Sequence, residues 1–204
     1  MNHQPAHTKY IMKLSLILAA TLLAVSWSSA RAADAYTIDP MHSHVGFAIN
    51  HLVINKVRGN FKEFAGTLSI EDKSILDAKG TIQAKSIDTG IAKRDEHLRS
   101  PDFFDVAKYP TITFQSKRVE KKGNQMVLVG DYTMHGVTKE LALNLTLNGP
   151  IKDPMGSTRV GLEAKGKLNR KDYGLAYNKV LETGGVMIGE EVELEIDAEA
   201  IKAK

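Results

Sequence analysis

Four side chains near the start of the patterned part of the chain could together bind a metal ion: Asp39, His42, His44 and His51. The spacing of His42 and His44 would place both imidazoles on one face of a strand. Imidazole is the commonest metal ligand in proteins, and zinc takes three or four such groups. Neither a cysteine nor a His-Glu-x-x-His pattern accompanies them. The spacing alone is a weak indication of a metal site, and a structural or solvent-facing role of these histidines is favoured. We therefore predict no metal site.

A second group of ionisable residues, Arg94, Asp95 and His97, lies in the segment Ile91 to Arg99. Arg94 and His97 could bind the anionic head group of a ligand. The alternative is a solvated helix face with local charge pairs, each worth only a few tenths of a kcal/mol. The alternative is favoured, although both remain open.

A third group follows a run of alternating residues and reads Arg170-Lys171-Asp172-Tyr173-Gly174. Arg170 could contact the polar end of a ligand, or it could pair with Asp172 at the rim of the fold; the ion pair is favoured. The chain contains no Gly-x-Ser-x-Gly motif, phosphate-binding loop or dinucleotide fingerprint. We predict no catalytic residue.

The elements that must position these groups are β-strands, because apolar and polar residues alternate through most of the chain after residue 33. The clearest runs are 141–147, with leucine at every second position, and 191–198, with acids on the opposite face. Strict alternation is typical of antiparallel strands with one dry and one wet face. The pattern predicts about eight strands in a single all-β domain. Further alternating runs lie at 45–49, 64–70, 82–84, 112–114, 126–134 and 162–168.

Two segments break this rhythm. Residues 91–99 are rich in helix formers, with Asp88 or Thr89 as the expected N-cap. Residues 171–190 form a long glycine-containing stretch without periodicity, and irregular segments of that length are usually functional or mobile.

Eight one-faced strands can close into a barrel, which removes exposed sheet edges. A barrel of this size is either filled by side chains or holds one small ligand. The predicted inner face contains no charged residue and includes small residues such as Gly130, Gly166, Ala164 and Ala198, which either leave room for a ligand or fit the taper of the barrel. The apolar residues expected to line the interior are Phe47, Ile49, Phe64, Leu68, Ile82, Phe114, Leu128, Met134, Leu143, Leu145, Leu162 and Leu194.

The charge of the chain argues against a nucleic-acid partner. The 204 residues contain 27 Lys and Arg against 24 Asp and Glu, and Lys9, Lys13 and Arg31 account for the whole excess. The remainder is neutral, so it lacks the basic surface that nucleic acid requires, and it indicates no docking patch. The absence of cysteine excludes disulfides and thiolate chemistry.

The first 32 residues are typical of a secretory signal peptide. Lys13 precedes the apolar run Leu14 to Val25, and Ala30-Arg31-Ala32 provides a small-x-small cleavage site. The run is shorter than the about 20 residues of a membrane-spanning helix. We expect cleavage after Ala32, export of a single domain covering 33–204, and no stable membrane insertion after cleavage.

Several motifs, taken in order, resemble the YceI-like family of exported lipid-binding proteins. The most specific stretch runs from Ser86-Ile-Asp88-Thr89-Gly90 through Arg94-Asp95-x-His97-Leu98 to Asp102-Phe103-Phe104-Asp105. The other matching blocks are Tyr36-Thr-Ile-Asp39-Pro-x-His42-Ser43, Val57-Arg-Gly59-x-Phe61, Gly136-Val137-Thr138-Lys139, Arg170-x-Asp172-Tyr173-Gly174 and Gly189-Glu190-Glu191-Val192.

This resemblance implies an eight-stranded antiparallel lipocalin-like barrel with a short helix packed beside it. It also implies a periplasmic binding or carrier protein for a long-chain polyisoprenoid or related amphiphile, of the isoprenoid quinone or prenyl phosphate class, linked in some members to stress response. No cofactor besides the bound lipid is expected, and Arg94, His97 and Arg170 join the expected ligand-binding residues.

Three questions stay open at this point. An enzyme acting on such a lipid from the barrel mouth, with His97, Arg94 and Asp95, is one alternative. A metal-binding or structural stress protein with a filled barrel is another, since His44 replaces a small polar residue common in the family. The oligomeric state is also open, with a homodimer as one alternative.

Overall fold

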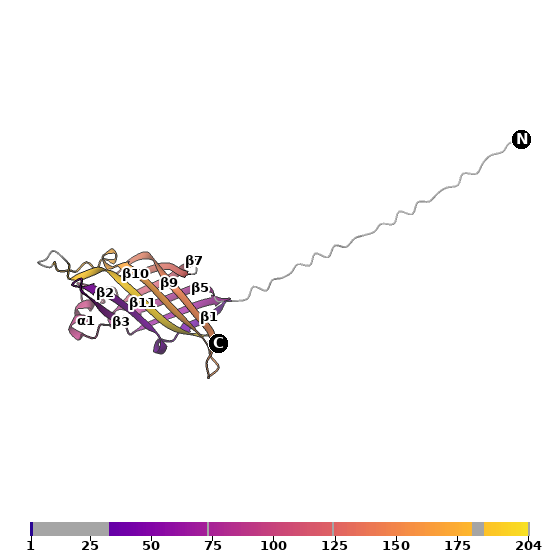
Figure 1. The fold of residues 1–204 in the computed structure, drawn as a ribbon, viewed down its shortest axis with the longest axis horizontal. Coiled ribbons are helices and arrows are strands. Elements are labelled where there is room, and N and C mark those ends of the chain that lie inside the picture. Colours follow the sequence, from indigo (N-terminus) through magenta and orange to yellow (C-terminus); the bar gives the residue numbers. More distant parts are fainter. Residues whose placement is uncertain (2–32, 73, 124, 181–185, 204) are drawn as a thin grey trace. The chain divides into compact units, whose positions relative to one another are not determined.

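The strands form a closed antiparallel barrel, as predicted (Figure 1). The computed structural model describes Met1 and residues 33–72, 74–123, 125–180 and 186–203. The order β1-β4-β5-β7-β8-β9-β10-β11 returns to β1, because β1 pairs with both β4 and β11. These eight are β1 (Asp34–Ile38), β4 (Phe64–Glu71), β5 (Ser74–Gln83), β7 (Thr111–Lys122), β8 (Gln125–Met134), β9 (Val137–Lys152), β10 (Thr158–Asn169) and β11 (Ile188–Lys202).

Three further strands extend the wall of the barrel at one end. They are β2 (His44–His51), β3 (Asn55–Phe61) and β6 (Ile87–Asp88). β2 pairs with β11, β3 pairs with β2, and β6 pairs with β3. β1 and β2 are therefore successive parts of one side of the wall, separated by the 3₁₀ turn η1 (Pro40–His42).

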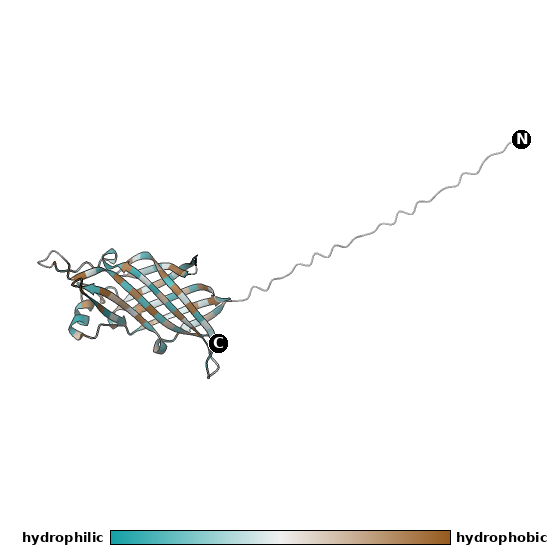
Figure 2. Cartoon of the chain, in the orientation of Figure 1, coloured by the Kyte–Doolittle hydropathy of each residue, from teal (hydrophilic) through white to brown (hydrophobic). Residues whose placement is uncertain are grey.

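The alternation in sequence becomes an inside and an outside in the barrel. Along β9, the side chains of Leu141, Leu143 and Leu145 are buried while the residues between them are exposed. Figure 2 shows the resulting change from hydrophilic to hydrophobic colour between neighbouring positions on the strands. Burial of each leucine stabilises the fold by roughly 1.5–3 kcal/mol, so the predicted strand faces are the faces of the core.

Strands β1, β3 and β6 were not among the predicted alternating runs, and the predicted run 45–49 is β2, which extends the wall. β3 shows the reason for one of these misses. Its inner positions are Val57, Gly59 and Phe61, so a glycine interrupts the apolar series that the pattern requires. A Cβ at Gly59 would lie 2.5 Å from Cζ of Phe47, which explains the glycine by the close approach of the Phe47 ring from β2.

The predicted helix is present as α1 (Ala92–Arg99), but its predicted cap is wrong. The N-cap residue is Ile91, and no side chain caps the helix. Thr89 does not accept hydrogen bonds from the helix, as a cap would; it donates to a side chain of the helix. Its backbone N and its Oγ1 both donate to Oδ1 of Asp95, at 2.9 and 2.5 Å. Asp95 is buried, and these two hydrogen bonds satisfy its carboxylate.

Two predictions concern parts of the chain that are only partly described or not described. The predicted signal peptide and its cleavage site lie outside the described residues, as do 181–185 of the irregular stretch 171–190. Among the helices of the described part, none combines the length and hydropathy needed to cross a bilayer.

Candidate ligand cavity

The barrel encloses an apolar cavity of about 260 Å³ at the end where β2, β3 and α1 lie. Its walls come from the inner faces of these elements, from the turn after α1, and from both sides of the irregular stretch 171–190. The lining residues are Phe47, Ile49, Asn50, His51, Val57, Phe61, Ile87, Thr89, Arg94, His97, Leu98, Phe103, Phe104, Ile112, Tyr132, Met134, Leu168, Arg170, Leu175, Tyr177, Met187, Ile188, Val192 and Leu194.

A second cavity of about 140 Å³ adjoins the first inside the barrel. Phe61, Ile112, Tyr132 and Leu194 line both, so these four side chains form the junction between two compartments. The inner compartment has almost entirely apolar walls from β4, β5, β7 and the strands opposite. The interior is therefore not a fully packed core.

Most residues that the sequence predicted for the interior lie in the walls of these compartments. The outer compartment contains Phe47, Ile49, Met134, Arg94, His97 and Arg170; the inner one contains Phe64, Leu68, Ile82, Phe114, Leu128, Leu143 and Leu162; and Leu194 belongs to both. Leu145 is the exception. It is 2% exposed and belongs to the buried core, but it lines neither cavity, because the barrel is packed with side chains at that level.

The sequence left open whether the small inner residues leave room for a ligand or accommodate the packing of the barrel, and the structure shows small residues in both settings. A Cβ at Gly130 would lie 2.6 Å from Cζ of Phe114, and one at Gly166 would lie 2.5 Å from Cδ2 of Leu143. These two glycines make room for neighbouring side chains. Ala164 and Ala198 line the inner compartment, where larger side chains would reduce its volume.

Polar groups of the outer compartment gather around α1. Arg94 Nε donates to Thr89 Oγ1 at 2.7 Å, and its Nη2 donates to the Thr89 carbonyl oxygen at 2.8 Å. His97 Nε2 lies 2.8 Å from Oδ2 of Asp102. Fixed in this way, Arg94 and His97 present polar edges to one end of an otherwise apolar space.

Arg170 is the buried cation of this site, and the predicted ion pair with Asp172 is wrong. Asp172 pairs with Lys139 Nζ at 3.3 Å. Arg170 is only 3% exposed, and its guanidinium donates to backbone carbonyl oxygens: Nε to Gly189 at 2.8 Å, and Nη1 to Leu175. Burial lowers the pKa of Arg170 from its ordinary value. The prediction that the inner face contains no charged residue is therefore wrong at Arg170.

The burial of Arg170 had a signal in the sequence. The alternating series Leu162, Ala164, Gly166 and Leu168 continues to position 170, which places Arg170 on the inner face. Some of the other lining residues that the sequence missed, such as Tyr177 and Met187, lie in the irregular stretch, where no periodicity assigns a face; others, such as Val57, Leu98 and Phe103, lie on β3, on α1 and in the turn after α1.

Aromatic rings join the irregular stretch to α1 at the mouth. The Tyr177 ring lies edge-on to His97, with centroids 4.9 Å apart, and 4.9 Å from the ring of Phe103. His97 and Phe103 are themselves edge-on at 5.0 Å. Such contacts are worth about 0.5–1.5 kcal/mol each, so the triad links the irregular stretch to α1 by weak interactions.

One hydroxyl group lies deep in the interior. Tyr132 is buried at the junction, and its oxygen has only the sulfur of Met134, at 3.8 Å, as a partner among the described residues. Loss of solvation raises the pKa of Tyr132, so the phenol stays protonated and available as a donor at neutral pH.

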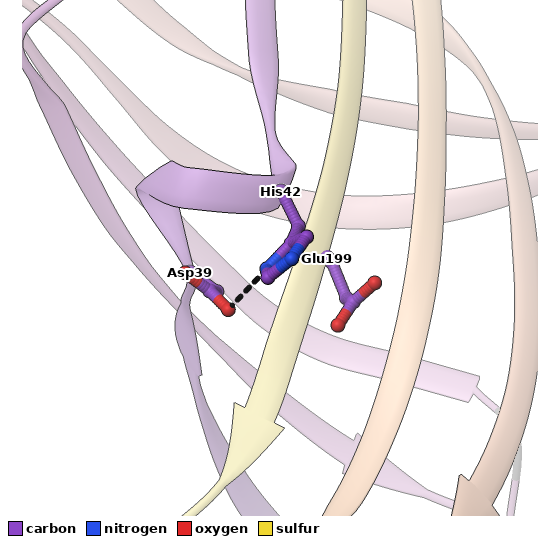
Figure 3. A group of neighbouring side chains, drawn as sticks. All are labelled: Asp39, His42 and Glu199. Atoms are coloured by element: carbon purple, nitrogen blue, oxygen red, sulfur yellow. Dashed lines mark hydrogen bonds and ion pairs between the residues drawn. The ribbon is translucent and has the colours of Figure 1, made fainter. Parts of the chain in front are cut away.

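The histidines considered as metal ligands do not come together. His51 lines the outer compartment and His44 lies exposed on β2, while His42 Nδ1 contacts Oδ2 of Asp39 at 2.9 Å. Glu199 completes a cluster with Asp39 and His42 (Figure 3). Arg159 Nη1 bonds to Asp39 at 3.0 Å and to Glu199 at 2.5 Å, so a guanidinium already provides the positive charge between these carboxylates.

Comparisons with known proteins agree with this architecture. The family model of the YceI-like domain matches residues 36–200. A UPF0312 protein of Staphylococcus aureus (strain N315) is 41% identical over 167 residues, which cover 80% of this chain and 95% of that protein. The structure of a Campylobacter jejuni YCEI protein, 30% identical, superposes with a TM-score of 0.66 over 76% of this chain and 90% of that one. A domain from Saccharophagus degradans described as polyisoprenoid binding, 19% identical, has a TM-score of 0.59 over 82% and 98% of the two chains.

Proposed function

Because the chain belongs to the YceI-like domain family, we propose that it binds a long-chain isoprenoid lipid inside the barrel and carries it through the periplasm. The observation that supports this most is the two-compartment apolar interior, with its polar groups concentrated at one end. Burying apolar chain there stabilises a complex by about 0.8 kcal/mol per CH₂ group. The description of the Saccharophagus degradans domain as polyisoprenoid binding supports the choice of ligand class.

The orientation of the lipid follows from the distribution of polar groups. The tail would pass the junction at Leu194 into the inner compartment, and the head group would stay near Arg94 and His97. A prenyl phosphate or an isoprenoid quinone would each find hydrogen-bond donors there. Met134 and Met187 line the outer compartment, and flexible thioether side chains adapt to ligands of different shape.

We infer a binding role rather than catalysis from the state of the ionisable groups. Asp95 accepts two hydrogen bonds from Thr89 and is buried, and Arg94 is held by the same threonine. A general acid or base must reach the reacting atom. Of the three residues considered for catalysis, Arg94 and His97 line the cavity; Thr89 holds Arg94, and Asp102 and the aromatic rings orient His97.

The periplasmic location rests on the predicted signal peptide, residues 1–32. A link to stress response follows from the family resemblance alone. Both are tested by fractionating the cells and by comparing the amount of protein under membrane-damaging and ordinary growth.

Native mass spectrometry of the exported protein, followed by organic extraction, tests the proposed ligand. We expect a stoichiometric adduct that is released as an isoprenoid lipid. An adduct-free mass that does not change when polyprenyl phosphates or quinones are added would contradict the proposal.

Two neighbouring substitutions on β11 provide a matched test. Leu194→Gln places an amide at the junction, while Glu195→Gln places the same amide on the outer face, where Glu195 is exposed beside Lys165. With circular dichroism showing both variants folded, Leu194→Gln should lose most of the adduct and Glu195→Gln should keep it. Equal lipid content in the two would rule out the junction as part of the binding site.

A further inference from the structure

Two chain segments at the cavity end of the barrel display large apolar side chains to solvent. The β2–β3 turn exposes Val53 and Ile54 by 77% and 86%, and the irregular stretch exposes Val180 by 79%. We call these three residues the apolar tips. Isolated exposed apolar residues are common on protein surfaces, but a group of them marks an interaction site.

Backbone hydrogen bonds hold the two segments side by side. The Leu52 amide donates to the Met187 carbonyl oxygen at 2.9 Å, and the Met187 amide donates to the carbonyl oxygen of Lys179 at 3.0 Å. Val180 and Val186 form an antiparallel bridge. The apolar tips therefore belong to one surface, although their positions in the sequence are far apart.

This surface adjoins the outer compartment at the end of the barrel that we take as its entrance. His51, which precedes the β2–β3 turn, lines the cavity, and so do Tyr177 and Met187 from the other segment. Figure 1 shows β2, β3 and α1 at one end of the barrel, and the C-terminus with the start of β1 at the other. A lipid that leaves the cavity at this end passes the apolar tips.

The backbone of the β2–β3 turn is strained where it presents these side chains. Leu52 and Val53 have φ angles of 54° and 64°, and a β-branched residue rarely adopts this left-handed conformation. Strain of this kind concentrates at functional positions. An asparagine or glycine would adopt this conformation with less strain than valine does.

The charge around the apolar tips is positive. Residues 51–58 and 177–187 contain three basic residues, Lys56, Arg58 and Lys179, against one acidic residue, Glu182. Lys56 pairs with Glu193 from β11 at 2.6 Å, and the pKa of Glu193 is lowered by its hydrogen bond to Lys56 and also by the charge of Arg58. Such a surface is complementary to an anionic one.

The opposite end of the barrel offers an internal comparison. Met41 and Met155 are each 90% exposed there, but their segments contain Asp39 and Asp153. Exposed apolar residues thus occur at both ends of the barrel.

We propose that the apolar tips dock the barrel on the surface of an anionic phospholipid bilayer, with the cavity entrance facing the membrane. Apolar side chains inserted at the interface and basic residues beside them are the two features that bind proteins reversibly to such surfaces. The sequence, neutral after residue 32, had indicated no docking patch; the fold creates one by joining two segments. The docking proposal is argued from the exposed apolar tips. The further step, that docking serves to load or release lipid, rests on the proposed function.

Co-sedimentation with vesicles tests the docking. Residues 33–204 contain every described strand and α1, so this segment is used, free of the apolar run at 14–25. The vesicles consist of phosphatidylcholine alone or mixed with phosphatidylglycerol. We expect binding to the mixed vesicles that Ile54→Asp and Val180→Asp each weaken about tenfold, which is the low end of the effect of burying one such side chain. Met155→Asp, at the opposite end, is the matched control and should bind as the unmodified segment does.

The outcomes separate docking from lipid binding. Absence of binding to the mixed vesicles, or equal binding by Ile54→Asp and Met155→Asp, would overturn the docking proposal. Binding that depends on phosphatidylglycerol but not on residue 54 or 180 would also overturn it, because charge alone would then suffice. The lipid content of each variant, measured by mass spectrometry, reports on the proposed function independently: Ile54→Asp should keep its bound lipid while it loses vesicle binding.

Discussion

Nε of Arg170 donates a hydrogen bond of 2.8 Å to the carbonyl oxygen of Gly189, linking the residue that follows β10 to the second residue of β11. The same guanidinium donates to Leu175, so one buried side chain holds both ends of the irregular stretch that borders the cavity. Residues 175, 177, 187 and 188 line the outer compartment. Arg170 therefore shapes the entrance as well as lining it.

Replacement of Arg170 by methionine should destabilise the protein by about 2–4 kcal/mol, because buried carbonyl oxygens lose charged donors. Urea denaturation measures the change. Lys171→Met is the control, since Lys171 forms an exposed pair with Glu190 and its loss should leave the midpoint nearly unchanged. Similar midpoints for the two variants would contradict the bracing role of Arg170.

Filling the inner compartment should change ligand length rather than abolish binding. Ala198→Phe places a ring in a space of about 140 Å³, so short isoprenoids should still bind while long ones are excluded. Native mass spectrometry with farnesyl and longer prenyl phosphates provides the readout. Leu145→Ala is the comparison: it should cost about 2–5 kcal/mol in stability without altering chain-length preference, because Leu145 lies outside the lining of both cavities.

Opening the aromatic triad should speed lipid release. Tyr177→Ala removes the edge-on contact with His97 and the contact with Phe103, and we expect release to accelerate by about two- to tenfold. Transfer of a fluorescent prenyl lipid to acceptor vesicles measures the rate. Tyr177→Phe keeps the ring and should release at the original rate; if it releases as fast as Tyr177→Ala, packing of the ring is not the cause.

The charged cluster around Arg159 should make stability depend on acid pH. Hydrogen bonds from His42 and then Arg159 lower the pKa of Asp39, and Arg159 lowers that of Asp153. Carboxylates with a lowered pKa stabilise the folded state above their unfolded value of about 3.8 and lose that contribution as the pH falls through the folded pKa. The melting temperature, measured from neutral pH down to about pH 2, should begin to decrease once the pH is below about 4. Arg159→Met should flatten this decline; an unchanged slope would count against the cluster as its source.

Relief of backbone strain at the apolar tips should stabilise the protein at the expense of docking. Val53→Gly removes the side chain from a left-handed position, and we expect a gain of about 1 kcal/mol together with weaker vesicle binding. Thermal melting and co-sedimentation report the two effects. A variant that is less stable than the parent would show that Val53 packs usefully within the turn.

The strands could be predicted from the sequence because their signal is local. In 141–147 and 191–198, apolar residues at every second position indicate which face of the strand is buried. Eight strands with one buried face each can share a single core by closing into a barrel. The interior lining followed from the same rule, and the rule extends to Arg170 at the end of β10. The rule failed at β3, where a glycine, Gly59, interrupts the apolar series because the ring of Phe47 occupies the space of its side chain.

Contacts between distant segments were decided by the tertiary structure. Alternation places Leu145 and Leu143 on the same face, yet only Leu143 borders a cavity, because the volume left free at each level depends on side chains from every strand around the barrel. The register of β2 against β11 brings Leu52 to Met187, and this joins Val53, Ile54 and Val180 into one surface. The sequence by itself thus determined the fold, the family resemblance and the apolar character of the interior, since each is encoded by neighbours along the chain. The partners of Arg170, the two compartments and the surface at the entrance depend on pairing across the closed sheet, which no local pattern specifies.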